Sequence, residues 1–139
     1  MKTTGELLDA LNNLNSIDNF WELYEAEICT VAPEEFLNDL VLSSSMRKVE
    51  IIEKADFDTV YFYQILSGKK TPSRDKLLRL LIAMRVPFKS CQFMLRLYGH
   101  ATLYPRIARD SILIYCINNE FPLEKVQQEL CTAGEEPIQ

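Results

Sequence analysis

Apolar residues recur along nearly the whole chain at the three- and four-residue spacing of an α-helix, and this pattern constrains the fold most. In residues 73–84, SRDKLLRLLIAM, the four residues Leu77, Leu78, Leu81 and Ile82 place apolar side chains on one helical face. No segment alternates polar and apolar residues as a half-buried strand does. Four glycines and six prolines supply few of the turns that an all-β fold needs. We therefore predict an all-α protein of about eight or nine short helices.

Capping residues indicate where these helices begin and end. Two short helices are expected before residue 32, and Pro33 suits the first turn of the next. Serines 43–45 are expected to cap a helix over MRKVEIIEKA, and Asp58 to cap another that ends at Gly68. Later helices are expected to start at Ser73, after Val86-Pro87, at Pro105 and at Pro122, with a stop at Gly134. No internal repeat is evident.

Bulk composition excludes several classes of protein. With 139 residues, 47% of them apolar and 25% charged, the chain is long enough for one compact domain with a real core, or for a small domain with a helical extension. No apolar run reaches the roughly 18–20 residues of a membrane span, and the acidic, amphipathic N-terminus is unlike a secretory signal. We expect a cytoplasmic protein with no membrane partner.

Catalysis and metal binding are not expected. The four cysteines (Cys29, Cys91, Cys116 and Cys131) form no CxxC pair, and His100 is the only histidine. No nucleophile with a nearby base, phosphate-binding glycine loop or scaffolded carboxylate pair is present. We therefore predict no catalytic residues, no metal ligands, no cofactor and no enzymatic activity, with the cysteines as structural thiols.

Charge is distributed unevenly along the chain. Residues 1–45 carry one lysine and nine carboxylates, whereas residues 46–79 carry eight cations and five carboxylates. The net charge of −5 therefore conceals a positive segment in the middle of the chain. The acidic N-terminal residues could compete with phosphates for this segment or form a solvated helical face, and we favour the solvated face.

The positive segment contains a helix-turn-helix pattern. Residues 46–66, MRKVEIIEKADFDTVYFYQIL, predict two helices around a short link at residues 55–57, in which the second helix would enter the major groove. Val49, Ile52, Phe62 and Ile65 are expected to be buried between these helices and their neighbours. The candidates for reading bases are Thr59, Val60, Tyr61 and Gln64. The candidates for contacting phosphates are Arg47, Lys48, Lys69 and Lys70.

Residues 46–86 resemble the phage repressor and Cro-like (XRE-type) helix-turn-helix family in the order of these helices, the Ser67-Gly68-Lys69 turn, Pro72-Ser73 and the leucine-rich helix. YQILSGKKTPSRDKLLRL and LYPRIARDSILIYCINN are similar to small Firmicutes regulators of this type. The resemblance implies a lambda-repressor-like DNA-binding core at residues 33–89, with an acidic N-terminal helical extension at 1–32 and a C-terminal helical extension at 90–139. It also implies a bacterial transcriptional regulator that binds double-stranded DNA as a homodimer, with the terminal helices open to a protein partner.

A second interpretation is a protein-interaction adaptor that keeps the repressor-like fold. Only Gln64 among the reading positions belongs to the residue types that pair with bases, and Asp56 and Asp58 bring negative charge near the phosphates. Four aromatic residues could form a partner surface, but their helical spacing favours core positions: Trp21, Tyr24, Tyr98 and Tyr104. Arg106, Arg109 and Asp110 are expected either to form a structural ion pair or to be an exposed surface.

Overall fold

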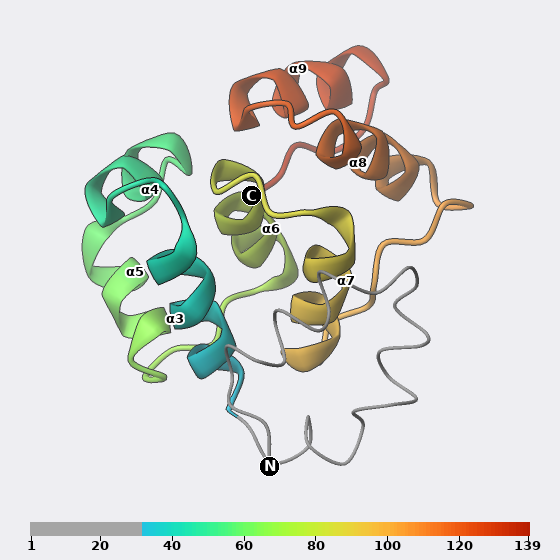
Figure 1. Cartoon of the computed structure of the whole chain (residues 1–139). Helices are drawn as coiled ribbons and strands as arrows, with labels where there is room; N and C mark the ends of the chain where they lie inside the picture. Colours follow the sequence, from blue (N-terminus) through green and yellow to red (C-terminus); the bar gives the residue numbers. More distant parts are fainter. Residues whose placement is uncertain (1–31) are drawn as a thin grey trace.

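A computed structural model describes residues 32–139, and this part of the chain is all-α, as predicted. It contains seven helices and no strand: α3 (Pro33–Ser43), α4 (Lys48–Lys54), α5 (Thr59–Leu66), α6 (Arg74–Ala83), α7 (Phe88–Leu97), α8 (Ala108–Asn118) and α9 (Leu123–Thr132). The helices expected before residue 32, and Trp21 and Tyr24 with them, lie outside the described residues. In Figure 1, α3, α4 and α5 lie on one side of α6, and α8 and α9 lie on the other.

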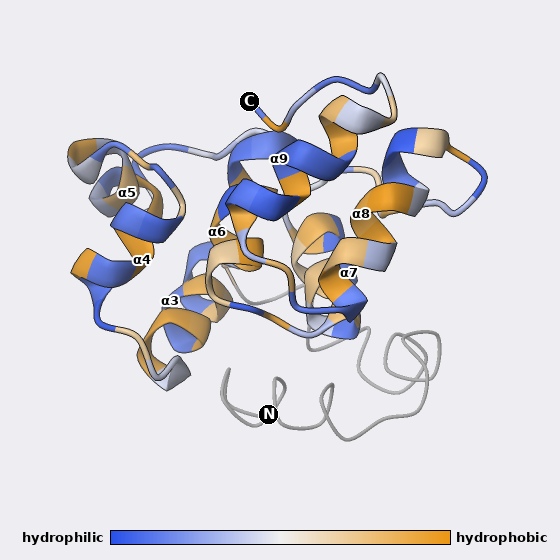
Figure 2. Cartoon of the chain, turned by 90° about the horizontal axis from the view of Figure 1, so that it is seen from above, coloured by the Kyte–Doolittle hydropathy of each residue, from blue (hydrophilic) through white to orange (hydrophobic). Residues whose placement is uncertain are grey.

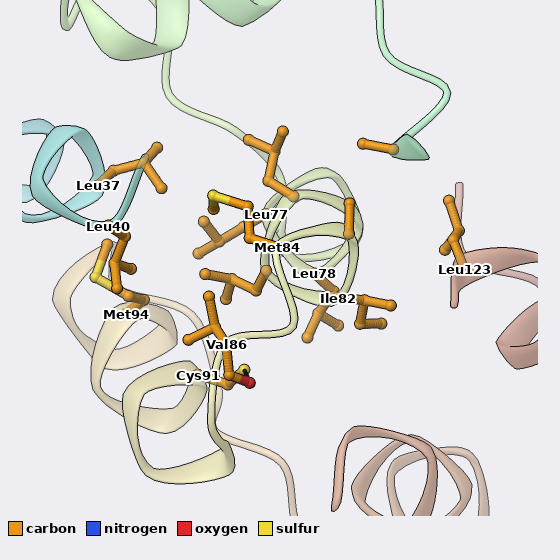
Figure 3. Packing of buried hydrophobic residues seen from close by; sticks show 14 of the residues in the cluster. Leu37, Leu40, Leu77, Leu78, Ile82, Met84, Val86, Cys91, Met94 and Leu123 are labelled. Atoms are coloured by element: carbon orange, nitrogen blue, oxygen red, sulfur yellow. Dashed lines mark hydrogen bonds between the residues drawn. The ribbon is translucent and has the colours of Figure 1, made fainter. Parts of the chain in front are cut away.

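Helix α6 is the centre of the described core and contacts α4, α7 and α9. Figure 3 shows Leu77, Leu78 and Ile82 of α6 among apolar side chains of α3, α7 and α9. All three are buried, and each large apolar side chain removed from water stabilises the fold by about 1.5–3 kcal/mol. In Figure 2, α9 presents a hydrophilic surface, because its apolar residues Leu123 and Val126 are turned into this core.

Several predicted helix ends are confirmed. Asp58 accepts a hydrogen bond from the backbone N–H of Tyr61 at 2.8 Å and so caps α5, and Ser73 caps α6 in the same way at 3.2 Å from Lys76 N. Pro33 is the first residue of α3. These side chains satisfy backbone donors that have no partner within the helix.

Two predicted helix starts are wrong. Serines 43–45 do not cap α4, because Ser44 Oγ accepts from the N–H of Met46 at 3.1 Å within the link, and Arg47 is the N-cap residue. Helix α8 begins at Ala108 instead of Pro105, because a turn closed by a hydrogen bond from Ile107 N to the Tyr104 carbonyl occupies the preceding residues. In both cases a local turn uses the residues that the pattern assigned to a helix.

The three hairpins α4–α5, α6–α7 and α8–α9 are joined by the same kind of link. Asp56, Arg85 and Glu120 have positive φ angles of 49°, 56° and 54°. In each link the next residue is apolar, and its N–H bonds back to the carbonyl five residues before it, as Phe57 does to Ile52 at 3.0 Å. This hydrogen bond is the Schellman closure of a helix C-terminus, which usually has glycine at the left-handed position.

The prediction that the chain contains no internal repeat is wrong. Residues 74–104, here called unit 1, and residues 109–139, unit 2, correspond at a constant offset of 35 positions. Arg74 corresponds to Arg109, Asp75 to Asp110, Pro87 to Pro122, Gln92 to Gln127 and Gly99 to Gly134. Most core positions differ between the units, although three apolar pairs are identical: Leu78 and Leu113, Ile82 and Ile117, and Leu95 and Leu130. The identical arginine, aspartate and glutamine residues make specific polar contacts.

The matched residues make matched hydrogen bonds. Gln92 pairs with both backbone groups of Leu103, at 2.9 and 2.7 Å, and Gln127 pairs in the same way with Ile138, at 2.9 and 2.8 Å. Arg74 donates to the carbonyl of Ala101 at 2.9 Å, as its counterpart Arg109 does to Glu136, also at 2.9 Å. Each unit therefore folds back a short segment after its second helix and holds it with one arginine and one glutamine.

The expected boundary after residue 89 falls inside α7, and one hydrophobic cluster includes residues from Phe36 to Ile138. The division of the chain at residues 33–89 and 90–139 stays a prediction.

Candidate nucleic-acid interface

The α4–α5 hairpin consists of two helices around a short link, which is the order of elements that the sequence pattern predicts. Its link runs through Ala55, Asp56 and Phe57, and the left-handed conformation of Asp56 (φ 49°) makes the turn. Phe62 and Ile65 of α5 are fully buried, as predicted. This burial fixes the inner flank of α5 and leaves its opposite flank to the surface.

The prediction for α4 is partly wrong. Val49 is 59% exposed, and Ile52 is only partly buried, whereas Ile51 is fully buried together with Ala55. The helical pattern permits either set, because both follow three- or four-residue spacing. Contact with α6 selects Ile51 and Ala55, and Val49 in the first turn points away from the core.

The base-reading candidates differ in how far they are exposed. Thr59 and Val60, in the first turn of α5, are exposed, Val60 to 64%. Gln64 is half-buried. Tyr61 is also half-buried, and its ring lies parallel to the ring of Phe57 with centroids 5.5 Å apart. Thr59 and Val60 therefore present the freest side chains, and Tyr61 is turned toward the α4–α5 link.

The phosphate-contact candidates lie at the ends of the two helices. Lys69 and Lys70 are exposed just after α5, where their backbone N–H groups bond to the carbonyl of Gln64 at 2.9 and 3.2 Å. Lys48 Nζ lies 5.8 Å from the centroid of the Tyr63 ring, which brings the start of α4 beside α5. These three lysines are exposed around α5.

Arg47, the fourth phosphate-contact candidate, has a local role. Its Nε lies 3.0 Å from Glu50 Oε1, and Glu50 in turn accepts from the Arg47 backbone N–H at 3.4 Å. The hydrogen bonds from Arg47 hold the pKa of the Glu50 carboxyl below its ordinary value. Arg47 would have to break this pairing, at least in part, to reach a phosphate.

Arg79 and Lys76 of α6 contact this hairpin, although sequence reasoning gave neither of them a role. Arg79 Nη1 donates to the carbonyl of Ala55 in the α4–α5 link at 3.1 Å, and Lys76 Nζ lies 5.9 Å from the centroid of the Phe57 ring. Both residues follow the motif in sequence and belong to the core helix, so no signal within the motif identifies them.

The arginine and aspartate residues near position 109 form ion pairs between the two units. Arg74 donates to both oxygens of Asp110 at 3.1 and 2.9 Å, and Arg109 donates to both oxygens of Asp75 at 3.2 and 3.0 Å. Burial alone would raise the pKa of Asp75, but hydrogen bonds from Arg109 and from the Gln139 N–H, with the nearby guanidinium charges, bring it below its ordinary value. Arg106 is exposed.

The aromatic predictions have a mixed outcome. Tyr98 is half-buried against the core, but Tyr104 is 52% exposed and its predicted core position is wrong. Tyr104 lies in the loop before α8, where its N–H bonds to Asp110 Oδ2 at 3.0 Å and its side chain points away from the core. The backbone contact fixes this residue, and its ring contributes little to packing.

Within residues 32–139, no cluster of three histidine, cysteine or acidic side chains is arranged to hold a metal ion, and no helix is long and apolar enough to cross a bilayer. Comparison of the chain with protein-family models, with curated proteins and with solved structures found no match.

Proposed function

We propose that this protein is a helix-turn-helix DNA-binding regulator of the repressor type, in which α5 enters the major groove. The observation that carries the proposal is the two-sided character of α5. Its inner flank is anchored by Phe62 and Ile65, and its first turn presents Thr59 and Val60 to solvent. A helix used for reading needs both properties, because rigid anchoring fixes its angle and free side chains make the contacts.

The charges around α5 support the same proposal. Lys48, Lys69 and Lys70 are exposed, and positive side chains at the ends of a groove-bound helix contact phosphates and set its register. Asp56 and Asp58 have structural roles, as the left-handed link residue and as the cap of α5. These roles explain why two acidic residues lie beside α5.

The competing proposal is a protein-interaction adaptor, and one observation favours it. Four apolar or aromatic side chains of α3, α4 and α5 are exposed: Leu42, Val49, Val60 and Tyr63. Such side chains are common at protein interfaces, and they carry no charge that would attract DNA.

A binding assay with genomic DNA fragments over a series of salt concentrations separates the two proposals. A regulator binds a subset of fragments tightly, and its affinity for them falls steeply as the salt concentration rises. The double variant Lys69→Ala/Lys70→Ala should lower the affinity for all fragments alike. It should also reduce the slope of log affinity against log salt concentration by about 2. Gln64→Ala should instead change which fragments bind best.

The matched control is Arg106→Ala/Lys125→Ala, which removes the same charge from the loop before α8 and from α9 and should leave the salt slope unchanged. Equal effects of the two double variants, or feeble binding to every fragment, would favour the adaptor.

A further inference from the structure

The C-terminal segment, residues 136–139, is held by side chains from both units. Arg109 donates to the carbonyls of Glu136 and Pro137, both at 2.9 Å, and Gln127 pairs with both backbone groups of Ile138. The N–H of Gln139 donates to Asp75 Oδ2 at 3.0 Å, and the Ile138 side chain is buried. Figure 1 shows this end of the chain beside α6.

Unit 1 has a matching segment at residues 101–103, which Arg74 and Gln92 hold by the same bonds. The two segments differ in one respect. Arg79 Nη2 and Nε donate to the carbonyls of Ile138 and Gln139 at 2.8 and 2.7 Å, whereas the position 35 residues later in unit 2 is Ile114, which has no guanidinium.

The third donor of Arg79 reaches the helix-turn-helix. Its Nη1 bonds to the carbonyl of Ala55 at 3.1 Å, next to the left-handed Asp56 in the α4–α5 link. One planar guanidinium therefore joins the segment 136–139 to the link that sets the angle between α4 and α5. Because the fork is rigid, a displacement of either end changes the hydrogen bonds at the other.

A cleft of about 460 Å³ lies between the end of α4 and the start of α9, and Arg79 lines it together with Lys54, Asp56 and Leu123. Beside this cleft, the hydrogen bonds of Arg79 to Ala55, Ile138 and Gln139 connect the α4–α5 turn with the C-terminal segment.

We propose that Arg79 is a positioning residue for α5, and that the segment 136–139 holds Arg79 in the geometry that fixes the α4–α5 turn. This inference rests on the proposed function, in which α5 reads DNA. It predicts that Gln127, whose side chain bonds to Ile138 and which lies outside the proposed DNA surface, nevertheless influences how selectively DNA is bound.

The test compares Gln127→Ala with Gln92→Ala, because each variant removes the same two hydrogen bonds from one of the matched segments. Amide hydrogen exchange measured by NMR on the full chain reports the turn directly through the N–H groups of Asp56 and Phe57, without any DNA. Exchange at Ile138 in one variant and at Leu103 in the other should accelerate, which shows that each segment has been released.

Gln127→Ala should accelerate exchange at Asp56 and Phe57 several-fold, and Arg79→Lys, which keeps the charge but not the fork, should do so by roughly tenfold. Gln92→Ala should leave both amides unchanged. Arg79→Lys should also lower the ratio of specific to non-specific DNA affinity several-fold, with no change in the salt slope, since Arg79 makes no phosphate contact in this proposal.

Unchanged exchange at Asp56 and Phe57 in both Gln127→Ala and Arg79→Lys would overturn the inference, as would equal effects of Gln92→Ala. Faster exchange with an unaltered specificity ratio would also overturn it, because Arg79 would then only stabilise the turn. If the unaltered protein binds no fragment selectively, the proposed function fails on its own, and the exchange data still decide whether the segment positions the turn.

Discussion

Arg74 and Arg109 each bind the aspartate that follows the other in sequence. Arg74 pairs with Asp110 at 2.9 Å and Arg109 with Asp75 at 3.0 Å, so the two units are joined by reciprocal ion pairs, as subunits are across a two-fold axis. The pairs are not equally buried, because the Asp110 side chain is 3% exposed and the Asp75 side chain 20%. This difference has a measurable consequence.

Arg74→Met should destabilise the protein by about 3 kcal/mol or more, because it leaves the carboxylate of Asp110 buried without its cation. Arg109→Met should cost less, since water reaches Asp75 more easily. Urea denaturation of the two variants gives the free energies of unfolding. Equal losses, or a larger loss for Arg109→Met, would contradict the prediction.

Acidification should weaken the contact between the units through Asp75. The pKa of Asp75 in the folded protein is lowered, so its contribution to stability is complete above the ordinary aspartate pKa of about 4 and is lost as the pH falls through the folded value. Urea denaturation at pH 6 and at several values below 4 should show this loss. The Asp75→Asn variant should be less stable than the unaltered protein at pH 6 and should lose less free energy of unfolding on acidification. If its stability changed with pH in parallel with that of the unaltered protein, the assignment to Asp75 would be refuted.

Glycine should stabilise the two hairpin links outside the candidate DNA interface. Arg85 and Glu120 have left-handed φ angles of 56° and 54°, which strain an L-residue by about 1 kcal/mol. Arg85→Gly and Glu120→Gly should therefore each raise the free energy of unfolding by roughly 0.5–1 kcal/mol, after glycine's greater freedom in the unfolded chain is counted.

Gly99→Ala is the matched control for these variants. Gly99 has φ +78°, and an added Cβ there would meet no atom within 4 Å, so any loss of stability reports the backbone alone. A stabilising Gly99→Ala would show that the left-handed conformation carries no such strain.

The cysteines should differ sharply in reactivity. Cys91 is fully buried and donates to the carbonyl of Val86 at 3.4 Å, and burial raises the pKa of its thiol to about 12. Cys131 is exposed on α9. In a Cys29→Ser background, a thiol reagent at pH 8 should modify Cys131 rapidly and Cys91 only after unfolding, because the thiolate is the reactive form. Rapid modification of Cys91 in the native protein would show that α7 opens readily.

Much of the local structure was predictable. Asp58 and Ser73 cap helices because their short side chains reach backbone N–H groups three residues ahead, which depends only on the adjacent sequence. Phe62 and Ile65 lie on the buried face of α5 because the helical period places them together. The prediction for Val49 failed because two apolar sets satisfy the same period in α4, and packing against α6 chose the other.

The sequence by itself determined the helical class, most helix ends and the buried flank of α5, because these follow from spacing and from contacts within a few residues. Only the tertiary structure decided the roles of Arg74, Arg79 and Arg109, which contact groups 24 to 60 residues away. It also decided that two dissimilar stretches are equivalent units. The physical reason is that a guanidinium acquires its role from the carbonyls and carboxylates that folding brings to it, and those partners come from other helices.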